Sequence, residues 1–267
     1  MSFFEHGKEL PLWEKLPPLS LGTGEHDIPT IKAFLPPAWK RNGRALVVFP
    51  GGGYGHYGEH EGDGYSEFFA AHGYCCFTVR YRLGKYGYHH PVELSDAARA
   101  VRLARLFADE CGFDASRVGA VGSSAGGHLA ATLGNIPDEA LCAGDASDAM
   151  PSRPDWTVLC YPVITFRDPY STYWTRKNLC GTDAPSPEII AHLSCDETVS
   201  EATPPSFLWH TFEDGVVPVE NSMLFAAALR RNKIPFELHI YERGGHGQGL
   251  FEGHPWSAEC LRWMEQF

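Results

Sequence analysis

Short apolar runs alternate with stretches of helical period along the chain from about residue 45 onward. Each run is bounded by glycine, proline or charged residues, which is typical of a strand buried in a sheet. Strands that alternate with helical stretches form the βαβ pattern of a mostly parallel sheet. The predicted strands are Ala45–Phe49, Cys75–Val79, Val118–Val121, Thr157–Cys160, Ser206–His210 and Phe236–Tyr241.

Amphipathic stretches lie between or after these strands, with apolar residues recurring at positions i, i+3, i+4 and i+7. In the clearest of them the apolar residues run from Leu94 to Ala108, and Arg99, Arg102 and Asp109 fall on the opposite face. The other two stretches are Asn221–Arg231 and Trp256–Phe267. The pattern as a whole predicts an α/β fold with a mostly parallel central sheet and helices on both faces.

We expect residues 1–267 to form one domain, because a chain of 267 residues with 43% hydrophobic content can bury one large core. Residues 1–44 are rich in proline and glycine and predict an irregular lead-in with one edge strand at Ile31–Phe34. Residues 162–205 show no strand pattern, and so long a span in a compact domain is usually functional. We interpret it as a pocket-shaping insertion; the alternative is surface helices and loops that do not contact substrate. The Tyr54–Tyr65 segment is expected to be a second loop over the pocket.

Charge and composition narrow the class of protein. The net charge is −11 and no cluster of lysine and arginine interrupts it, so nucleic-acid binding is not expected. No stretch approaches the roughly 20 apolar residues that span a bilayer, and Met1–Leu10 lacks the apolar run of a signal peptide. The eight cysteines are scattered without C-x-x-C spacing, which predicts reduced thiols. We therefore expect a cytoplasmic protein without a membrane partner.

The strongest local signal is a G-x-S-x-G motif over Gly122–Gly126, with Ser124 at its centre. The motif follows the apolar run Arg117–Val121 and leads into the helix-compatible run Gly127–Leu133. A serine nucleophile needs such a sharp turn between strand and helix, and the helix N-terminus favours developing negative charge. The motif alone is weak, but its context predicts a nucleophile of the α/β-hydrolase fold.

A glycine run, Gly51–Gly53, follows the strand Ala45–Phe49. Glycines let the backbone face a substrate without an intervening Cβ, and in α/β-hydrolases this loop supplies N–H groups to the oxyanion hole. We assign the N–H groups of Gly52, Gly53 and Ala125 as its donors. A phosphate-binding loop is the weaker alternative, because the G-K-[ST] that it needs is absent.

The acid and the base of a triad should follow the serine in that order. Asp214 comes soon after the strand Ser206–His210 and four residues before Pro218, where a carboxylate can turn inward to orient an imidazole. Glu213 is the fallback. His246 lies in a glycine-rich loop directly after the last strand, which makes it the predicted base.

Other histidines have simpler interpretations. His128 on a helix and His239 in a strand are expected to be structural. His89 and His90 are adjacent, but no carboxylate or thiol at a suitable spacing completes a metal site. We therefore expect no metal ion and no other cofactor.

Between about residues 44 and 255, several short segments occur in the same order as in one known group of enzymes. The chain resembles bacterial α/β-hydrolases of the acetyl-xylan esterase or carbohydrate-esterase-like group, which is related to feruloyl esterases and acetylesterases. The segments that carry the resemblance are Pro50–Tyr54, Tyr81–Leu83, Gly122–Ala130, Tyr161–Val163, Trp209–Thr211, Val217–Ser222 and Gly244–Gly247. Hormone-sensitive-lipase-like enzymes share features, but they carry histidine where this chain has Pro50.

The resemblance implies an α/β-hydrolase with a triad of Ser124, Asp214 and His246, in agreement with the assignment from spacing. It also implies a serine esterase that hydrolyses short-chain acyl esters. The small-molecule substrates that it implies are acetyl esters of O-acetylated sugars or xylo-oligosaccharides. The alternatives are a small peptidase of the prolyl-oligopeptidase type and a catalytically silent hydrolase fold that binds a ligand.

Aromatic residues near the expected pocket indicate sugar stacking, although core packing is the commoner fate of such rings. They are Tyr54, Tyr57, Tyr65, Tyr170, Tyr173 and Trp174. We predict substrate contacts for Tyr54, Tyr161 and Trp174.

Overall fold

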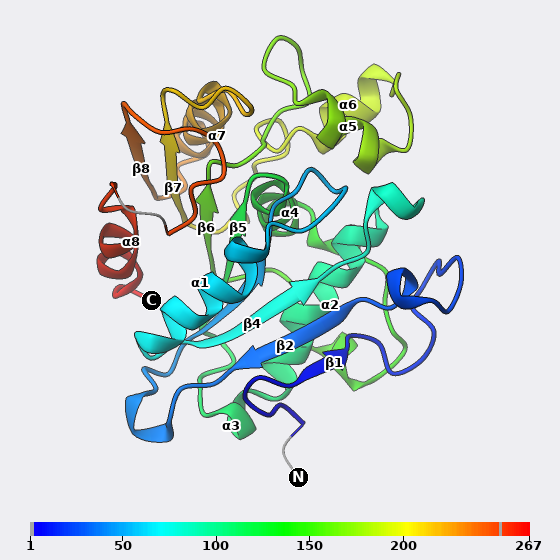
Figure 1. Ribbon diagram of the computed structural model, residues 1–267, viewed down its shortest axis with the longest axis vertical. Helices are drawn as coiled ribbons and strands as arrows, with labels where there is room; N and C mark the ends of the chain where they lie inside the picture. The colour runs from blue at the N-terminus through cyan, green and yellow to red at the C-terminus, as the bar shows by residue number, and fades with distance from the viewer. Residues whose placement is uncertain (1–2, 251–252) are drawn as a thin grey trace.

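One eight-stranded sheet runs through the computed structural model, which describes residues 3–250 and 253–267. The strand order is β1-β2-β4-β3-β5-β6-β7-β8 (Figure 1). The pairs β1–β2 and β2–β4 are antiparallel, and every pair from β4 to β8 in this order is parallel. The strands are β1 Glu9–Pro11, β2 Thr30–Phe34, β3 Ala45–Phe49, β4 Cys75–Arg80, β5 Val118–Ser123, β6 Trp156–Cys160, β7 Ser206–Thr211 and β8 Phe236–Tyr241.

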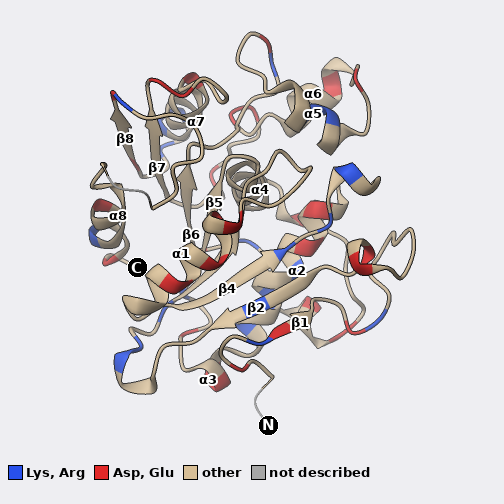
Figure 2. Cartoon of the chain, in the orientation of Figure 1, with Lys and Arg blue, Asp and Glu red and all other residues tan. Residues whose placement is uncertain are grey.

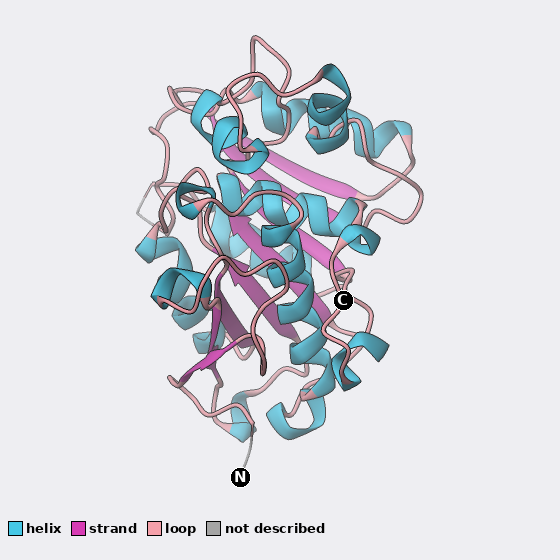
Figure 3. Ribbon diagram, turned by 90° about the vertical axis from the view of Figure 1, so that its right-hand side faces the viewer, coloured by secondary structure: helices cyan, strands magenta, loops and turns pink. Residues whose placement is uncertain are grey.

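Helices cover both faces of the sheet (Figure 3). The strands read as continuous apolar runs because alternate residues enter two separate cores. In β3, for example, Val47 belongs to the core under α2, α4 and α7, whereas Leu46 and Val48 belong to the core under α1 and α8. The helices are α1 Glu59–Ala71, α2 Val92–Leu106, α3 Ala108–Cys111, α4 Ala125–Asn135, α5 Tyr173–Cys180, α6 Pro187–Leu193, α7 Glu220–Arg231 and α8 Trp256–Met264. The mostly parallel α/β fold is confirmed.

One local expectation is wrong, and one polar helix position is more buried than its residue type suggests. The Tyr54–Tyr65 segment is not all loop, because α1 begins at Glu59 and buries Tyr65 in the core. The buried position is Arg99: the residue is 4% exposed, its side chain donates to the Leu12 carbonyl at 3.0 Å, and it pairs with Asp145 at 2.7 Å. The N-terminal lead-in packs over this face of α2, which is why a polar position of the helix is buried.

The lead-in is also more regular than its composition predicts. It contributes the predicted edge strand, β2, and the short strand β1, which was not predicted because three residues carry no periodic signal. Trp13 of the lead-in donates from Nε1 to the buried Asp96 at 2.8 Å. These contacts join the lead-in to the sheet and to α2.

Parallel strands bring the loops at their carboxyl ends to one edge of the sheet, where α/β proteins place their ligands. The loops after β3, β5, β7 and β8 carry the glycine run, Ser124, Asp214 and His246. Residues 162–205 follow β6 and form α5 and α6, which lie beyond this edge in Figure 1. The topology therefore gathers all the predicted site loops.

Basic residues are spread over several elements and do not gather on one face in the view of Figure 2. Within the part of the chain that the structure describes, no helix combines the length and apolarity needed to cross a bilayer. The absence of a nucleic-acid partner and a cytoplasmic location both stay predictions.

Candidate active site

Ser124 lies on a sharp turn between β5 and α4, with φ 53° and ψ −119°. A non-glycine residue in such a backbone conformation is strained and persists only where its surroundings enforce it. The turn is tight: a Cβ added to Gly122 would lie 2.1 Å from the Gly126 carbonyl oxygen, and one added to Gly126 would lie 2.0 Å from the Phe49 carbonyl oxygen. The glycines of the motif are therefore required for this turn, which exposes the Ser124 hydroxyl at the cleft.

The structure brings the three predicted triad residues together. His246 Nε2 lies 2.9 Å from Ser124 Oγ, and His246 Nδ1 lies 2.7 Å from Asp214 Oδ2. Both distances are those of hydrogen bonds. In this arrangement His246 can take the serine proton while Asp214 holds the ring in one tautomer.

Four polar groups surround the Asp214 carboxylate. The N–H groups of Val216 and Val217 each donate to Oδ1 at 2.9 Å, and His246 and His210 face Oδ2 at 2.7 and 3.3 Å. Burial alone would raise the pKa of Asp214, but the hydrogen bonds from His210 and His246 outweigh it, and the pKa lies well below its usual range. The carboxylate is thus kept ionised. The fallback Glu213 instead accepts the Gly244 N–H at 3.0 Å and supports the start of the His246 loop.

His210 is a neighbour of Asp214 to which the sequence motifs gave no role. It is fully buried; its Nε2 lies 3.0 Å from the Val217 carbonyl, and its Nδ1 lies 2.8 Å from Ser222 Oγ. A carbonyl can only accept, so Nε2 carries the proton and Nδ1 accepts from the Ser222 hydroxyl. The only sequence signal was its place in the Trp209–Thr211 segment of the family resemblance.

The glycine loop lies beside Ser124 in the same cleft. Gly52 and Gly53 have φ of 123° and 60°, and a Cβ added to Gly52 would lie 2.1 Å from the His56 carbonyl oxygen. Among the described residues, no acceptor for the N–H groups of Gly52 or Gly53 is found. Ala125 begins α4 directly after Ser124. Of the three predicted oxyanion donors, two thus lie in the glycine loop beside Ser124 and the third at the start of α4.

A buried carboxylate links the glycine loop to the His246 loop. Glu61, on α1, is 4% exposed; its Oε2 accepts the Gly51 N–H at 2.9 Å, and its Oε1 accepts the Tyr161 hydroxyl at 2.6 Å. The Tyr161 oxygen in turn accepts the Gly249 N–H at 2.9 Å, and its ring meets the His246 ring edge-on at 5.1 Å. Burial raises the pKa of Tyr161 well above its usual value, so the hydroxyl stays a donor. We call this Glu61–Tyr161 pair the brace.

Of the three residues predicted to contact substrate, one lines the cleft and two are buried. Trp174 is 65% exposed and lines the cleft beside Ser124. Tyr54 and Tyr161 are buried in the two cores, and the Tyr54 hydroxyl bonds to His128 Nδ1 at 2.9 Å. The prediction is wrong for these two tyrosines, because their rings are 0% and 2% exposed and neither lines the cleft.

The cleft itself has a volume of about 750 Å³ and contains the Ser124 and His246 side chains. Residues 162–205 contribute Thr172, Trp174, Thr175 and Asn178 to its wall. Asn178 also donates to the Gly53 carbonyl at 2.7 Å, which ties the insertion to the glycine loop. The insertion is therefore in a position to contact substrate.

Among the residues that the structure describes, two side-chain clusters have ligand atoms close enough for a metal ion. One joins His90 with Glu139 and His192, and the other joins Glu237, His239 and Glu259. In the first, Glu139 Oε2 lies 3.2 Å from His90 Nε2 and 2.9 Å from His192 Nε2, so hydrogen bonds account for the arrangement. Sequence spacing could not bring these distant residues together. That the protein uses no metal or other cofactor stays a prediction.

The fold and the site define a serine-type α/β-hydrolase. Residues 31–229 match the BD-FAE family, and this chain belongs to it. The chain is 37% identical over 204 residues to endo-1,4-beta-xylanase B of Butyrivibrio fibrisolvens, covering 76% of this chain and 32% of that protein. It is 32% identical over 213 residues to an acetylxylan esterase of Xylanibacter ruminicola, covering 78% of this chain and 42% of that protein. The chain thus spans less than half the length of these relatives.

A solved structure covers the chain more fully. The crystal structure of an acetyl ester-xyloside bifunctional hydrolase from Caldicellulosiruptor lactoaceticus is 36% identical, with a TM-score of 0.88, and the match covers 100% of this chain and 98% of that one. The α/β-hydrolase fold and the resemblance to the acetyl-xylan esterase-like group are confirmed. At the level of class, so is the prediction of a carboxylic ester hydrolase.

Proposed function

We propose that this protein is a serine esterase that removes short acyl groups, above all acetyl, from O-acetylated sugars or xylo-oligosaccharides. The observation that carries the proposal is the continuous hydrogen-bonded line from Asp214 through His246 to Ser124, with hydrogen bonds of 2.7 and 2.9 Å. The open cleft beside this line admits a small ester. Relatives named for acetyl ester or acetylxylan hydrolysis support the choice of substrate.

The first half of the reaction transfers the acyl group to the enzyme. Ser124 Oγ attacks the ester carbon while its proton passes to His246 Nε2, and the negative charge that develops on the carbonyl oxygen is stabilised by backbone N–H groups of the glycine loop and Ala125. When the tetrahedral intermediate collapses, His246 returns the proton to the alcohol oxygen, and the alcohol leaves. An acyl-enzyme on Ser124 remains.

The second half releases the acid. His246 takes a proton from water, whose oxygen attacks the acyl carbon, and the same N–H groups again stabilise the oxyanion. Collapse expels Ser124 Oγ, which recovers a proton from His246. Asp214 stays ionised throughout, since its pKa lies well below its usual range, and it stabilises the imidazolium in both halves.

The test is hydrolysis of p-nitrophenyl acetate, butyrate and octanoate, followed by acetate release from acetylated xylo-oligosaccharides. We expect turnover to fall with acyl length and to drop by at least about 10⁴-fold in Ser124→Ala, which removes the nucleophile. Ser123→Ala is the matched control, because Ser123 is buried next to the nucleophile and donates to Tyr65 at 3.1 Å.

Each other outcome favours a different protein. Equal activity of wild type and Ser124→Ala would contradict the triad. Activity on a proline-linked anilide without activity on aryl acetates would favour a peptidase. A wild type inert on every ester would favour a ligand-binding hydrolase fold.

A further inference from the structure

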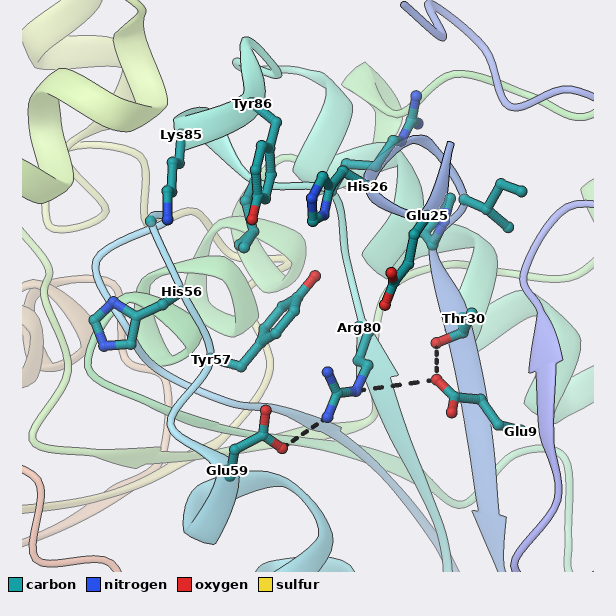
Figure 4. A pocket seen from close by; sticks show the side chains of 15 residues that line it. Glu9, Glu25, His26, Thr30, His56, Tyr57, Glu59, Arg80, Lys85 and Tyr86 are labelled. Atoms are coloured by element: carbon teal, nitrogen blue, oxygen red, sulfur yellow. Dashed lines mark hydrogen bonds and ion pairs between the residues drawn. The ribbon is translucent and has the colours of Figure 1, made fainter. Parts of the chain in front are cut away.

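A second cavity adjoins the catalytic cleft. It has a volume of about 390 Å³ and shares Gly55, His56 and Lys85 with the cleft that contains Ser124. Figure 4 shows Lys85 and His56 at one end of it and Glu9 and Thr30 at the other. The cavity therefore extends the cleft away from the reacting atoms, over the N-terminal part of the sheet.

Aromatic rings form the walls of this cavity. His26 and Tyr86 stack on each other, with ring centroids 3.7 Å apart and planes 10° apart, and Tyr57 faces the same space (Figure 4). Tyr86 is 37% exposed, although large aromatic rings usually bury more of their surface. The stack covers one face of each ring, so the outer face and the polar edges are what such rings can offer to a ligand.

The charges in the cavity are mostly compensated. Arg80 lies between Glu59, at 2.7 Å, and Glu9, at 4.0 Å. Lys85, at the junction with the cleft, lies 5.5 Å from the centre of the Tyr86 ring. Carboxylates and cations thus alternate along the wall, which suits a neutral ligand rich in hydroxyl groups better than an anion or a cation.

We propose that this second cavity binds sugar units of a neutral acetylated oligosaccharide beyond the unit that carries the acetyl group. The inference rests on the proposed function, since it names where the alcohol part of that ester extends. An acetyl group is too small to occupy the catalytic cleft, so most of the substrate's contacts must come from its alcohol part. Placed with the ester at Ser124, a chain of sugar rings reaches the second cavity past His56 and Lys85. The lead-in, through Glu25 and His26, then forms part of the substrate site.

The test compares acetylated xylotetraose with acetylated methyl xyloside and p-nitrophenyl acetate, as kcat/KM. We expect the wild type to prefer the tetraose over the monosaccharide by about tenfold or more, and Tyr86→Ala and His26→Ala each to lower that preference about five- to tenfold through KM. Tyr86→Phe keeps the ring and should keep the preference. Trp39→Ala is the control for loss of an aromatic, because Trp39 is 84% exposed and lines neither cavity.

The outcomes separate this inference from the proposed function. If the wild type hydrolyses p-nitrophenyl acetate but neither acetylated sugar, the sugar substrate and the second cavity's role both fail. Equal use of tetraose and monosaccharide, or an unchanged preference in the variants, would overturn the inference and leave the proposed esterase intact. A loss of activity in Tyr86→Ala that is equal on all three substrates would mark a structural effect and also overturn it.

Discussion

The two sides of the proposed triad of Ser124, His246 and Asp214 differ in the groups that form them. On the side that faces the cleft lie backbone N–H groups and partly exposed side chains such as Trp174. On the other side, the core side, lie three polar groups, each no more than 4% exposed and each in polar contact with a loop or residue of the site. They are Tyr161, His210 and Glu61, and Glu61 also borders the cleft. Binding contacts thus belong to the cleft side, whereas the positions of the reacting atoms depend on buried polar groups. Changes on the core side should lower kcat, and changes on the cleft side should raise KM.

The largest effect is expected at Asp214, where the core side meets the triad. Asp214→Asn should lower kcat by about 10⁴-fold, because an amide donor facing His246 Nδ1 favours the wrong imidazole tautomer. Steady-state kinetics on p-nitrophenyl acetate measure this loss. Asp138→Asn, at an exposed site, controls for loss of a carboxylate. A loss of less than tenfold would show that Asp214 does not orient the base.

The same residue gives a pH dependence of stability. The pKa of Asp214 is lower in the folded protein than in the unfolded chain, where it is about 3.9, so the ionised carboxylate stabilises the fold above that pH. This contribution is lost as pH falls through the folded pKa. The difference in unfolding free energy between wild type and Asp214→Asn should therefore stay constant from pH 7 to about 4 and shrink below it. Urea titrations at several pH values check this, and a difference that grows on acidification would contradict it.

The next effect is expected at the brace. Glu61→Gln replaces one acceptor oxygen with an amide donor, so either the Gly51 N–H or the Tyr161 hydroxyl loses its partner. We expect kcat to fall about 10–100-fold, since small displacements of an oxyanion loop are costly, while KM changes less than threefold. Kinetics on p-nitrophenyl acetate separate the two constants.

Glu59→Gln is the matched control on the same helix, because Glu59 is exposed and lies in the first turn of α1. Tyr161→Phe removes the other half of the brace and should lower kcat in the same way. If Glu61→Gln raised KM at constant kcat, Glu61 would belong to the cleft side, and the division between the two sides would fail there.

This division also explains what the sequence could predict. Ser124, Asp214 and His246 each stand in a short motif at the end of a strand, and parallel strands bring such ends together whatever the details of packing. The strands themselves were found because apolar runs buried on both faces are a local signal. The three residues that the structure brings together could therefore be identified from local patterns.

The brace could not be predicted from the sequence, because it joins groups that only the fold brings together. Glu61 lies 100 residues from Tyr161, in a segment that was expected to be a loop. The direction of Tyr54 and Tyr161 was likewise missed: both have positive φ, which no sequence pattern of a tyrosine indicates, and both point into the core. Arg99 was missed because the lead-in covers it.

The smallest effect is expected on the cleft side. Trp174→Ala removes an exposed ring from the wall that residues 162–205 contribute, without touching the hydrogen bonds of the triad. We expect KM for acetylated xylo-oligosaccharides to rise about three- to fivefold and kcat to stay within about twofold, because the ring would bind the substrate and its transition state alike. Trp39→Ala, an exposed tryptophan away from the cleft, should change neither constant. A fall in kcat at constant KM would mean instead that the insertion positions the glycine loop, through the hydrogen bond from Asn178 to the Gly53 carbonyl. The groups that fix the positions of the reacting atoms would then include part of the insertion as well as Glu61, Tyr161 and His210.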